Sequence, residues 1–143
     1  MKTSAIPHIT QSQSYHMSMQ VSVSTLRFGP LTITVCYVKP RTDIEIILQG
    51  LHNMFNNNPN CAHIVMGDFN VDLASSSGSR ATRLVDYFHQ HMMRSAFTGD
   101  IITTRGGTFI DAIFTTFQLD MITANPYISM SSSYHLPLYL RAG

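Results

Sequence analysis

A short run of mostly apolar residues, Cys61–Met66, is the feature that most constrains how this chain can fold. It is bounded by an Asn-Pro segment at 56–59 and by Gly67–Asn70, both of which are typical of turns that end a helix or a strand. An apolar run of this length indicates a strand that is covered on both faces. The run therefore predicts a layered domain with a central strand at 61–66.

Alternating apolar and polar residues predict a hairpin before this strand. Residues 17–24 place Met and Val at every second position, which is the pattern of a strand with one buried face. Residues 31–37 alternate again, and their apolar members share one face: Leu31, Ile33, Val35 and Tyr37. Phe28–Pro30 between them is typical of a turn. We expect an antiparallel hairpin, preceded by an irregular polar segment at 1–15.

Two amphipathic helices flank the central strand in the sequence. Thr42–Glu45 fits a capping box, in which Thr42 and Glu45 satisfy each other's free amides, and an apolar stripe follows it. A second helix is predicted at 79–93, with these side chains inward: Leu84, Val85, Phe88 and Met92. Further strands are expected at 108–114, 121–128 and 136–140. Alternating strands and helices with hairpins predict an α/β fold in layers.

Composition restricts the class of protein and of partner. The 143 residues are 44% hydrophobic, which is enough for one compact domain with a sizeable core. The nine Lys and Arg are scattered and the net charge is +1, so a nucleic-acid partner must be recognised through the active site or by segments outside this chain. Cys36 and Cys61 lack metal-ligand spacing and are expected to be buried. The start has no apolar leader or membrane anchor, so we expect an intracellular protein.

Asp68 and Asn70 follow the predicted buried strand and are two residues apart. In extended backbone this spacing puts both side chains on the same side, at the carboxyl end of the strand. Open α/β sheets often bind ligands at this edge. An ordinary turn explains the same residues, because Gly, Asp and Asn favour turns. Spacing alone leaves both interpretations open.

Asp111 stands inside a run of bulky apolar residues at 108–114. A carboxylate in such surroundings needs a partner, because burying it unpaired costs several kcal/mol. The partner is either a backbone amide or an Arg, or else a catalytic His or a metal. His135 lies in a loop before the last predicted strand, and we rank it above the other histidines because of the segments taken together. The others are expected to be solvated or structural: His8, His16, His52, His63, His89 and His91.

Four segments, in the same order, resemble the endonuclease/exonuclease/phosphatase superfamily, which has the fold of DNase I and of the abasic-site endonucleases. His63–Asn70, which ends in Gly-Asp-Phe-Asn, is the most specific of the four. Val35–Pro40 is similar to the family's strand ending in Tyr and Pro, and 108–114 to its Ile-Asp-x-Ile-Phe strand. Ser133–Pro137 resembles its C-terminal Ser-Asp-His-x-Pro motif. Thr103–Thr108 further resembles the endonuclease-like domains of mobile elements.

The resemblance implies a role for each matching residue. Asp68 would position or deprotonate the attacking water, and Asn70 would hold a phosphate oxygen. His135 would hydrogen-bond the phosphate in the transition state, Asp111 would orient that imidazole, and Tyr37 would reach the phosphate from the end of the hairpin. Mg²⁺ or Mn²⁺, with Asp68 and Asn70 as its ligands, would neutralise charge on the phosphate.

Two departures from the family limit what the resemblance implies. The family's early segments carry an Asn and a Glu that is the main metal ligand, whereas the one Glu of this chain, Glu45, is better explained as a helix cap. Tyr134 stands where the family usually has Asp, and a neutral phenol cannot replace a carboxylate at a cation. The implied fold is a DNase I-like two-sheet sandwich with outer helices, truncated at its N-terminus, with 16–143 as the partial domain.

The implied truncation has a consequence for stability. Without the N-terminal strands, we expect apolar residues such as Met19, Val21 and Val23 to lack partners. The chain alone is then expected to be marginally stable or poorly soluble.

Three functions remain open from the sequence. The first is metal-dependent endonucleolytic hydrolysis of nucleic acid, with DNA favoured over RNA, in the nucleus or the cytoplasm. The second is a catalytically inactive, nucleic-acid-binding remnant of a larger protein. The third is a phosphatase acting on a small phosphoester, although a basic loop that would favour inositol lipids is not visible in the sequence.

Overall fold

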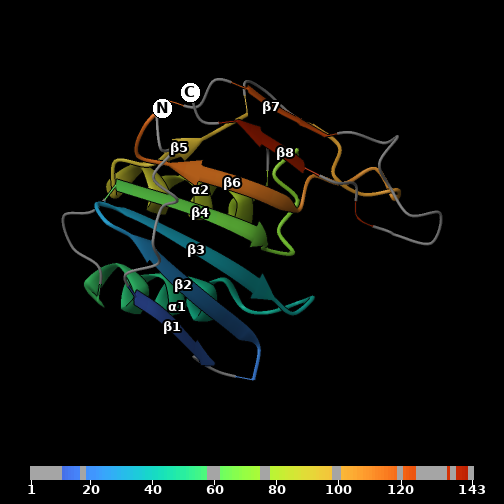
Figure 1. Ribbon diagram of the computed structural model, residues 1–143. Coiled ribbons are helices and arrows are strands. Elements are labelled where there is room, and N and C mark those ends of the chain that lie inside the picture. The colour runs from blue at the N-terminus through green and yellow to red at the C-terminus, as the bar shows by residue number, and fades with distance from the viewer. Residues whose placement is uncertain are drawn as a thin grey trace.

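The computed structural model describes residues 11–16, 19–57, 62–74, 78–97, 101–118, 121–124, 135 and 138–141. Its main feature is a six-stranded sheet with the strand order β1-β2-β3-β4-β6-β5, and a second sheet has two strands, β7 and β8. The helices α1 and α2 lie on one face of the large sheet (Figure 1). This arrangement confirms the predicted α/β fold with two sheets and outer helices.

The large sheet combines antiparallel hairpins with one parallel pair. β1, β2 and β3 run antiparallel, β4 lies parallel to β3 after the crossover through α1, and β6 is antiparallel to both β4 and β5. The elements have these bounds: β1 Gln11–His16, β2 Val21–Phe28, β3 Leu31–Val38, α1 Ile44–Asn57, β4 Ala62–Asp68, α2 Ser79–Gln90, β5 Arg94–Ser95, β6 Asp111–Thr115, β7 Met121–Ala124 and β8 Leu138–Arg141.

The core lies between the helices and one face of the large sheet. Phe88 of α2 stacks on Phe114 of β6 with ring centroids 3.9 Å apart, and Phe69 meets both rings edge-on. The middle of the central β4 is buried here as predicted, at His63, Ile64 and Val65, and Val65 is fully inaccessible. Cys36 also faces this core, and burial raises the pKa of its thiol to about 12. Cys61 lies outside the described residues.

The hairpin buries a different face of β3 from the one that its apolar residues would favour. The buried side chains are Thr32, Thr34, Cys36 and Val38, while Val35 and Tyr37 are about half exposed. The helices cover this side of the sheet, and the hydroxyl groups of Thr25 and Thr34 satisfy each other at 3.1 Å.

The N-terminal expectations were partly wrong. Gln11–His16 forms β1 rather than an irregular segment, because its backbone pairs with β2 even though its sequence lacks an apolar period. The strand expected at 17–24 begins at Val21 instead. The expectation that apolar residues would lack partners is wrong for Val21 and Val23, which lie in the core, and Met19 is 88% exposed.

The predicted capping box is also wrong. The side chain of Asp43, not that of Thr42, accepts the Glu45 amide at 2.8 Å, whereas the Thr42 hydroxyl donates to the Lys39 carbonyl. The Glu45 carboxylate pairs with Arg83 of α2 instead of reaching back to the cap.

The second helix ends earlier than its apolar pattern predicts. α2 stops at Gln90, and Met92 has a φ of 60°. This left-handed residue reverses the chain, so Met92 is 81% exposed and Met93 is fully buried in its place. β7 and β8 occupy parts of the two predicted C-terminal strands. Among the described residues, no helix is long and apolar enough to cross a membrane.

Candidate active site

Sheet register places three polar side chains in one row. Tyr37 at the end of β3 pairs with Asp68 at the end of β4, and Asp68 pairs with Asp111 at the start of β6. Residues that pair in register point to the same face of a sheet. This face is opposite to the one that the helices cover, because the neighbouring Cys36 and Ala112 point into the core.

The Gly-Asp-Phe-Asn turn fixes Asp68 and Asn70. One oxygen of the Asp68 carboxylate accepts the Asn70 amide at 3.0 Å. Asn70 has a φ of 49°, a left-handed conformation that Asn tolerates better than most residues. Its side-chain NH₂ donates to the Val38 carbonyl, which ties the turn to the end of β3.

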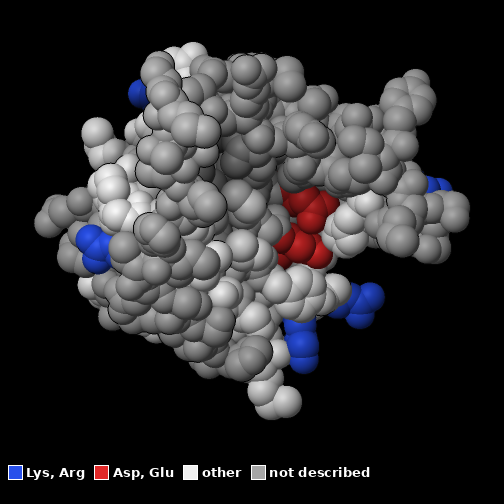
Figure 2. Space-filling view, in the orientation of Figure 1, with Lys and Arg blue, Asp and Glu red and all other residues white. Residues whose placement is uncertain are grey.

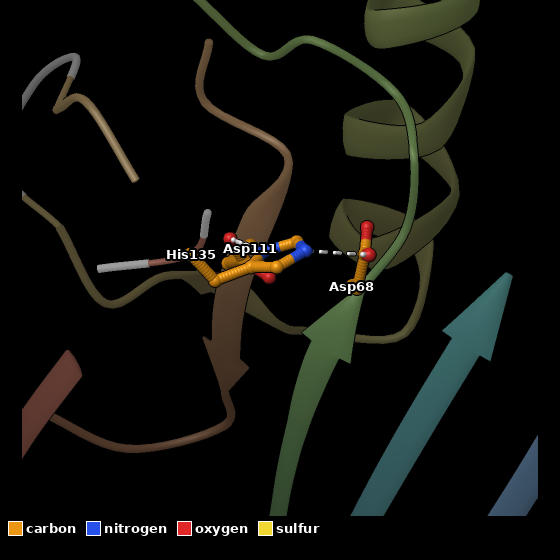
Figure 3. A group of neighbouring side chains, drawn as sticks. All are labelled: Asp68, Asp111 and His135. Carbon is orange, nitrogen blue, oxygen red and sulfur yellow. Dashed lines mark hydrogen bonds and ion pairs between the residues drawn. The ribbon is translucent and has the colours of Figure 1, made fainter. Parts of the chain in front are cut away.

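His135 joins the two carboxylates. Its Nδ1 lies 2.8 Å from Asp111 Oδ2, and its Nε2 lies 3.6 Å from Asp68 Oδ2 (Figure 3). The side chain of His135 is 44% exposed, while each carboxylate side chain is only 15% exposed. Figure 2 shows acidic side chains exposed in a hollow of this face, with Lys and Arg side chains at one side of it.

The surroundings of His135 and Asp68 raise the pKa of both groups. The hydrogen bond to Asp111 raises the pKa of His135 above its ordinary 6.5, and both carboxylate charges add to this effect, which burial opposes. Burial raises the pKa of Asp68 above 3.8, and the charge of Asp111 adds to the shift. The Asn70 amide and His135 lower it in part. The arrangement therefore favours an imidazolium held between two carboxylates.

The same three residues could hold a cation. Ligand atoms of Asp68, Asp111 and His135 all lie within 4.8 Å of one another, which makes them the metal-binding candidate of the described chain. Carboxylate oxygens suit Mg²⁺ or Mn²⁺, and the Asn70 carbonyl oxygen is a donor of the same kind. Asp111 commits Oδ2 to His135, so Asp68 is the carboxylate better able to bind a cation.

Of the other residues that the sequence pointed to, Tyr37 lies beside the site and Glu45 lies outside it. Tyr37 is 47% exposed on the row beside Asp68, and Tyr134 lies outside the described residues. Glu45 is not a member of the metal-binding candidate group and pairs with Arg83 instead.

Sequence reasoning missed two residues next to the site. Asp72 accepts the amides of Ala74 and Phe109, and Thr103 accepts that of Asp111. The only signal for them was their position, two residues after the Gly-Asp-Phe-Asn turn and at the start of the Thr103–Thr108 segment.

Three solved structures illustrate how widely this fold is shared. The endonuclease domain of TRAS1, a telomere-specific non-LTR retrotransposon, is 18% identical, with a TM-score of 0.70 over 92% of this chain and 67% of that one. An endonuclease/exonuclease/phosphatase family protein from Leptotrichia buccalis is 12% identical, with a TM-score of 0.60 over 94% and 61%. A mannosyl-6-phosphatase from Bacteroides thetaiotaomicron is 15% identical, with a TM-score of 0.62 over 94% and 66%. The chain thus spans between 61% and 67% of the length of these proteins.

Sequence comparison gives the family. A search of curated proteins found no match. The family model described as "Endonuclease-reverse transcriptase" matches residues 31–139, which include Tyr37, Asp68, Asn70, Asp111 and His135. The chain therefore belongs to this family of the endonuclease/exonuclease/phosphatase superfamily, with the DNase I-like fold.

Proposed function

We propose that the site hydrolyses phosphodiester bonds of nucleic acid with the help of a divalent cation. The observation that carries the proposal is the imidazole of His135 held between Asp111 and Asp68. Such a site offers a cationic hydrogen-bond donor, the imidazolium of His135, and beside it a carboxylate proton acceptor, Asp68. In-line displacement at phosphorus needs both, since the attacking water loses a proton while negative charge grows on the phosphoryl oxygens.

The three side chains divide the work. Asp111 accepts the Nδ1–H of His135 and so fixes the orientation of the ring. Only the imidazolium has a second proton, on Nε2, to donate to a phosphoryl oxygen. Asp68 would accept the proton of the attacking water or hold that water in line.

Asn70 and Tyr37 complete the contacts. The Asn70 NH₂ uses one proton for the Val38 carbonyl, and the other can reach a phosphate oxygen. The Tyr37 hydroxyl would donate from the neighbouring strand end. A Mg²⁺ or Mn²⁺ held by Asp68 and Asn70 would supply charge neutralisation at the phosphate.

The experiment is plasmid nicking by the full chain in Mg²⁺ and in EDTA. Asp68→Ala should reduce the nicking rate by at least about 100-fold, because it removes the proton acceptor and a cation ligand. Asp86→Ala, at an exposed position on α2, is the matched control and should retain the activity.

Two outcomes would favour the other functions. Wild type that is inactive but still binds DNA is expected of a nucleic-acid-binding remnant. Hydrolysis of a small phosphomonoester without plasmid nicking is expected of a phosphatase, the activity named for one of the similar structures.

Lys39 and Arg41 favour an extended anionic substrate over a small one. Both are exposed and directly follow β3, whose end carries Tyr37. Arg41 has a φ of 62°, an unusual conformation that is often retained at functional sites. A nucleic acid presents phosphates on both sides of the scissile bond, which two such cations could neutralise. The proposed substrate is DNA, and the proposed location of the protein is the nucleus or the cytoplasm.

Removing the charges of Lys39 and Arg41 should weaken DNA binding in a salt-dependent way. Lys39→Gln with Arg41→Gln is expected to lower the slope of log K against log salt by about 2, since each phosphate contact contributes about 0.9. Fluorescence anisotropy of a labelled duplex over a salt series measures the slope. Arg94→Gln should leave the slope unchanged, because Arg94 lies on β5 and pairs with Thr115, at the end of β6 that is far from Asp111. An unaltered slope in the double variant would remove both residues from the substrate surface.

A further inference from the structure

Within the part of the chain that the structure describes, no strand lies where it could accept a hydrogen bond from the amide of Asp111. The amide of Phe69 donates to the Ile110 carbonyl at 3.0 Å. Hydrogen-bonded and non-hydrogen-bonded pairs alternate along an antiparallel ladder, so the next pair, Asp68 with Asp111, exchanges no hydrogen bonds. The Asp111 amide therefore points away from β4. On that side β5 pairs only with Phe114 and Thr115, and its last contact is from Ala96 to Ile113. The edge strand has ended before it reaches Asp111.

The hydroxyl of Thr103 takes the place of the absent strand. It accepts the amides of Ile110 and Asp111, each at 3.1 Å, and donates to the Thr108 carbonyl at 3.3 Å. A hydroxyl has one proton and two lone pairs, so these three bonds use its whole capacity. Thr103 is fully buried, which keeps water from competing for the same positions.

The next residue holds the other member of the pair. Thr104 forms an isolated antiparallel bridge with His135, and its hydroxyl accepts the Thr108 amide at 3.2 Å. Neighbouring residues of one segment thus contact the start of β6 on one side and the backbone of His135 on the other.

Asp72 secures the same segment from the Gly-Asp-Phe-Asn turn. Its carboxylate accepts the Phe109 amide at 3.0 Å, and the Leu73 amide donates to the Phe109 carbonyl at 2.9 Å. The path from Asp68 to Asp111 is therefore fixed through side chains as well as through the sheet.

From these contacts we infer that Thr103 is a positioning residue, whose buried hydroxyl holds Asp111 where its carboxylate can orient the imidazole of His135. Where it concerns turnover, the inference rests on the proposed hydrolysis. Where it concerns geometry, it stands on the hydrogen bonds alone.

The test compares Thr103→Val with Thr103→Ser in the full chain. Val keeps the shape of Thr and removes the hydroxyl, so kcat for plasmid nicking should fall roughly 10- to 100-fold, while KM changes little. Ser keeps the hydroxyl and should remain within about threefold of wild type in kcat. Thr32→Val is the matched control, because Thr32 is fully buried, its hydroxyl has no hydrogen-bond partner among the described residues, and it lies toward the far end of β3.

Two NMR readouts make the test independent of turnover. The amides of Ile110 and Asp111 should lose protection from hydrogen exchange in Thr103→Val but not in Thr103→Ser or Thr32→Val. The downfield Nδ1 proton of His135, which reports its hydrogen bond to Asp111, should be lost or shifted in the Val variant alone. If wild type does not cleave DNA, the proposed function fails and these readouts still decide the inference.

Several results would overturn it. Retained protection of both amides in Thr103→Val would show that the hydroxyl does not hold them. Lost protection with wild-type kcat, or with an unchanged His135 proton, would show that the contact does not position the pair. If Thr103→Val and Thr103→Ala both fail to fold, the hydroxyl serves folding and not the site.

Discussion

Replacing His135 with Gln should lower the rate of plasmid nicking by about 100- to 1000-fold, the effect expected for loss of a donor to a developing oxyanion. Gln can still donate a hydrogen bond, but it carries no charge. The imidazolium is favoured in this site because Asp111 binds it at 2.8 Å and raises the pKa of the ring. The measurement is the initial nicking rate at saturating Mg²⁺, with circular dichroism to confirm folding.

His89→Gln provides the matched control, since His89 is exposed in the last turn of α2. It should nick DNA at the wild-type rate. Activity of His135→Gln within about threefold of wild type would contradict a role for the imidazolium, because the expected loss is far larger.

The same geometry fixes the direction of the pH dependence. Nicking should fall at low pH as Asp68 becomes protonated, with a midpoint above 3.8 because its pKa is raised. It should fall again at high pH as His135 loses its proton, with a midpoint above 6.5. Asp111→Asn removes the main cause of the His135 shift, so the alkaline midpoint should move to lower pH. A pH–rate profile of both proteins tests this, and an unmoved alkaline limb would assign it to another group.

The sequence pointed to Asp68 and Asp111 through local signals, whereas His135 stood out only because of the segments taken together. Gly-Asp-Phe-Asn follows a buried strand, and Asp111 is conspicuous among apolar neighbours. Their convergence with His135 depends on the pairing of β4 with β6, which joins residues 43 positions apart in the chain at Asp68 and Asp111. A local sequence pattern does not show which strands pair. Here the expectation that Asp68, Asp111 and His135 lie together came from the family resemblance.

Other features could not be read from the pattern because tertiary contacts decide them. β1 has no apolar period and is held by backbone pairing with β2. The left-handed conformation of Met92 exchanges the places of two neighbouring Met residues. Thr103 appeared in the sequence only as the first residue of the Thr103–Thr108 segment, and its hydrogen bond to the Asp111 amide could not be foreseen because it depends on the early end of β5.

Gly67→Ala should be the most destabilising of the substitutions considered, because β4 and β3 approach each other too closely there for a side chain. A Cβ on Gly67 would lie 1.8 Å from the Cys36 carbonyl oxygen and 2.8 Å from its carbon. Both are backbone atoms in a paired strand, so neither can rotate away. The φ of 150° adds a strain that Ala would not relieve. Together these effects predict a loss of about 3 kcal/mol or more in the free energy of unfolding.

Urea unfolding followed by circular dichroism measures this loss, and Gly29→Ala separates its two causes. Gly29 also has a positive φ, 55°, but a Cβ there meets nothing within 4 Å. Its replacement should lower the unfolding free energy by only about 1 kcal/mol, the strain of a left-handed residue. Equal losses in the two variants would mean that the strands separate easily at Gly67. In that case Tyr37 and Asp68, which pair one residue farther along, would not be held in fixed register, and the row of polar side chains across β3, β4 and β6 would be loose.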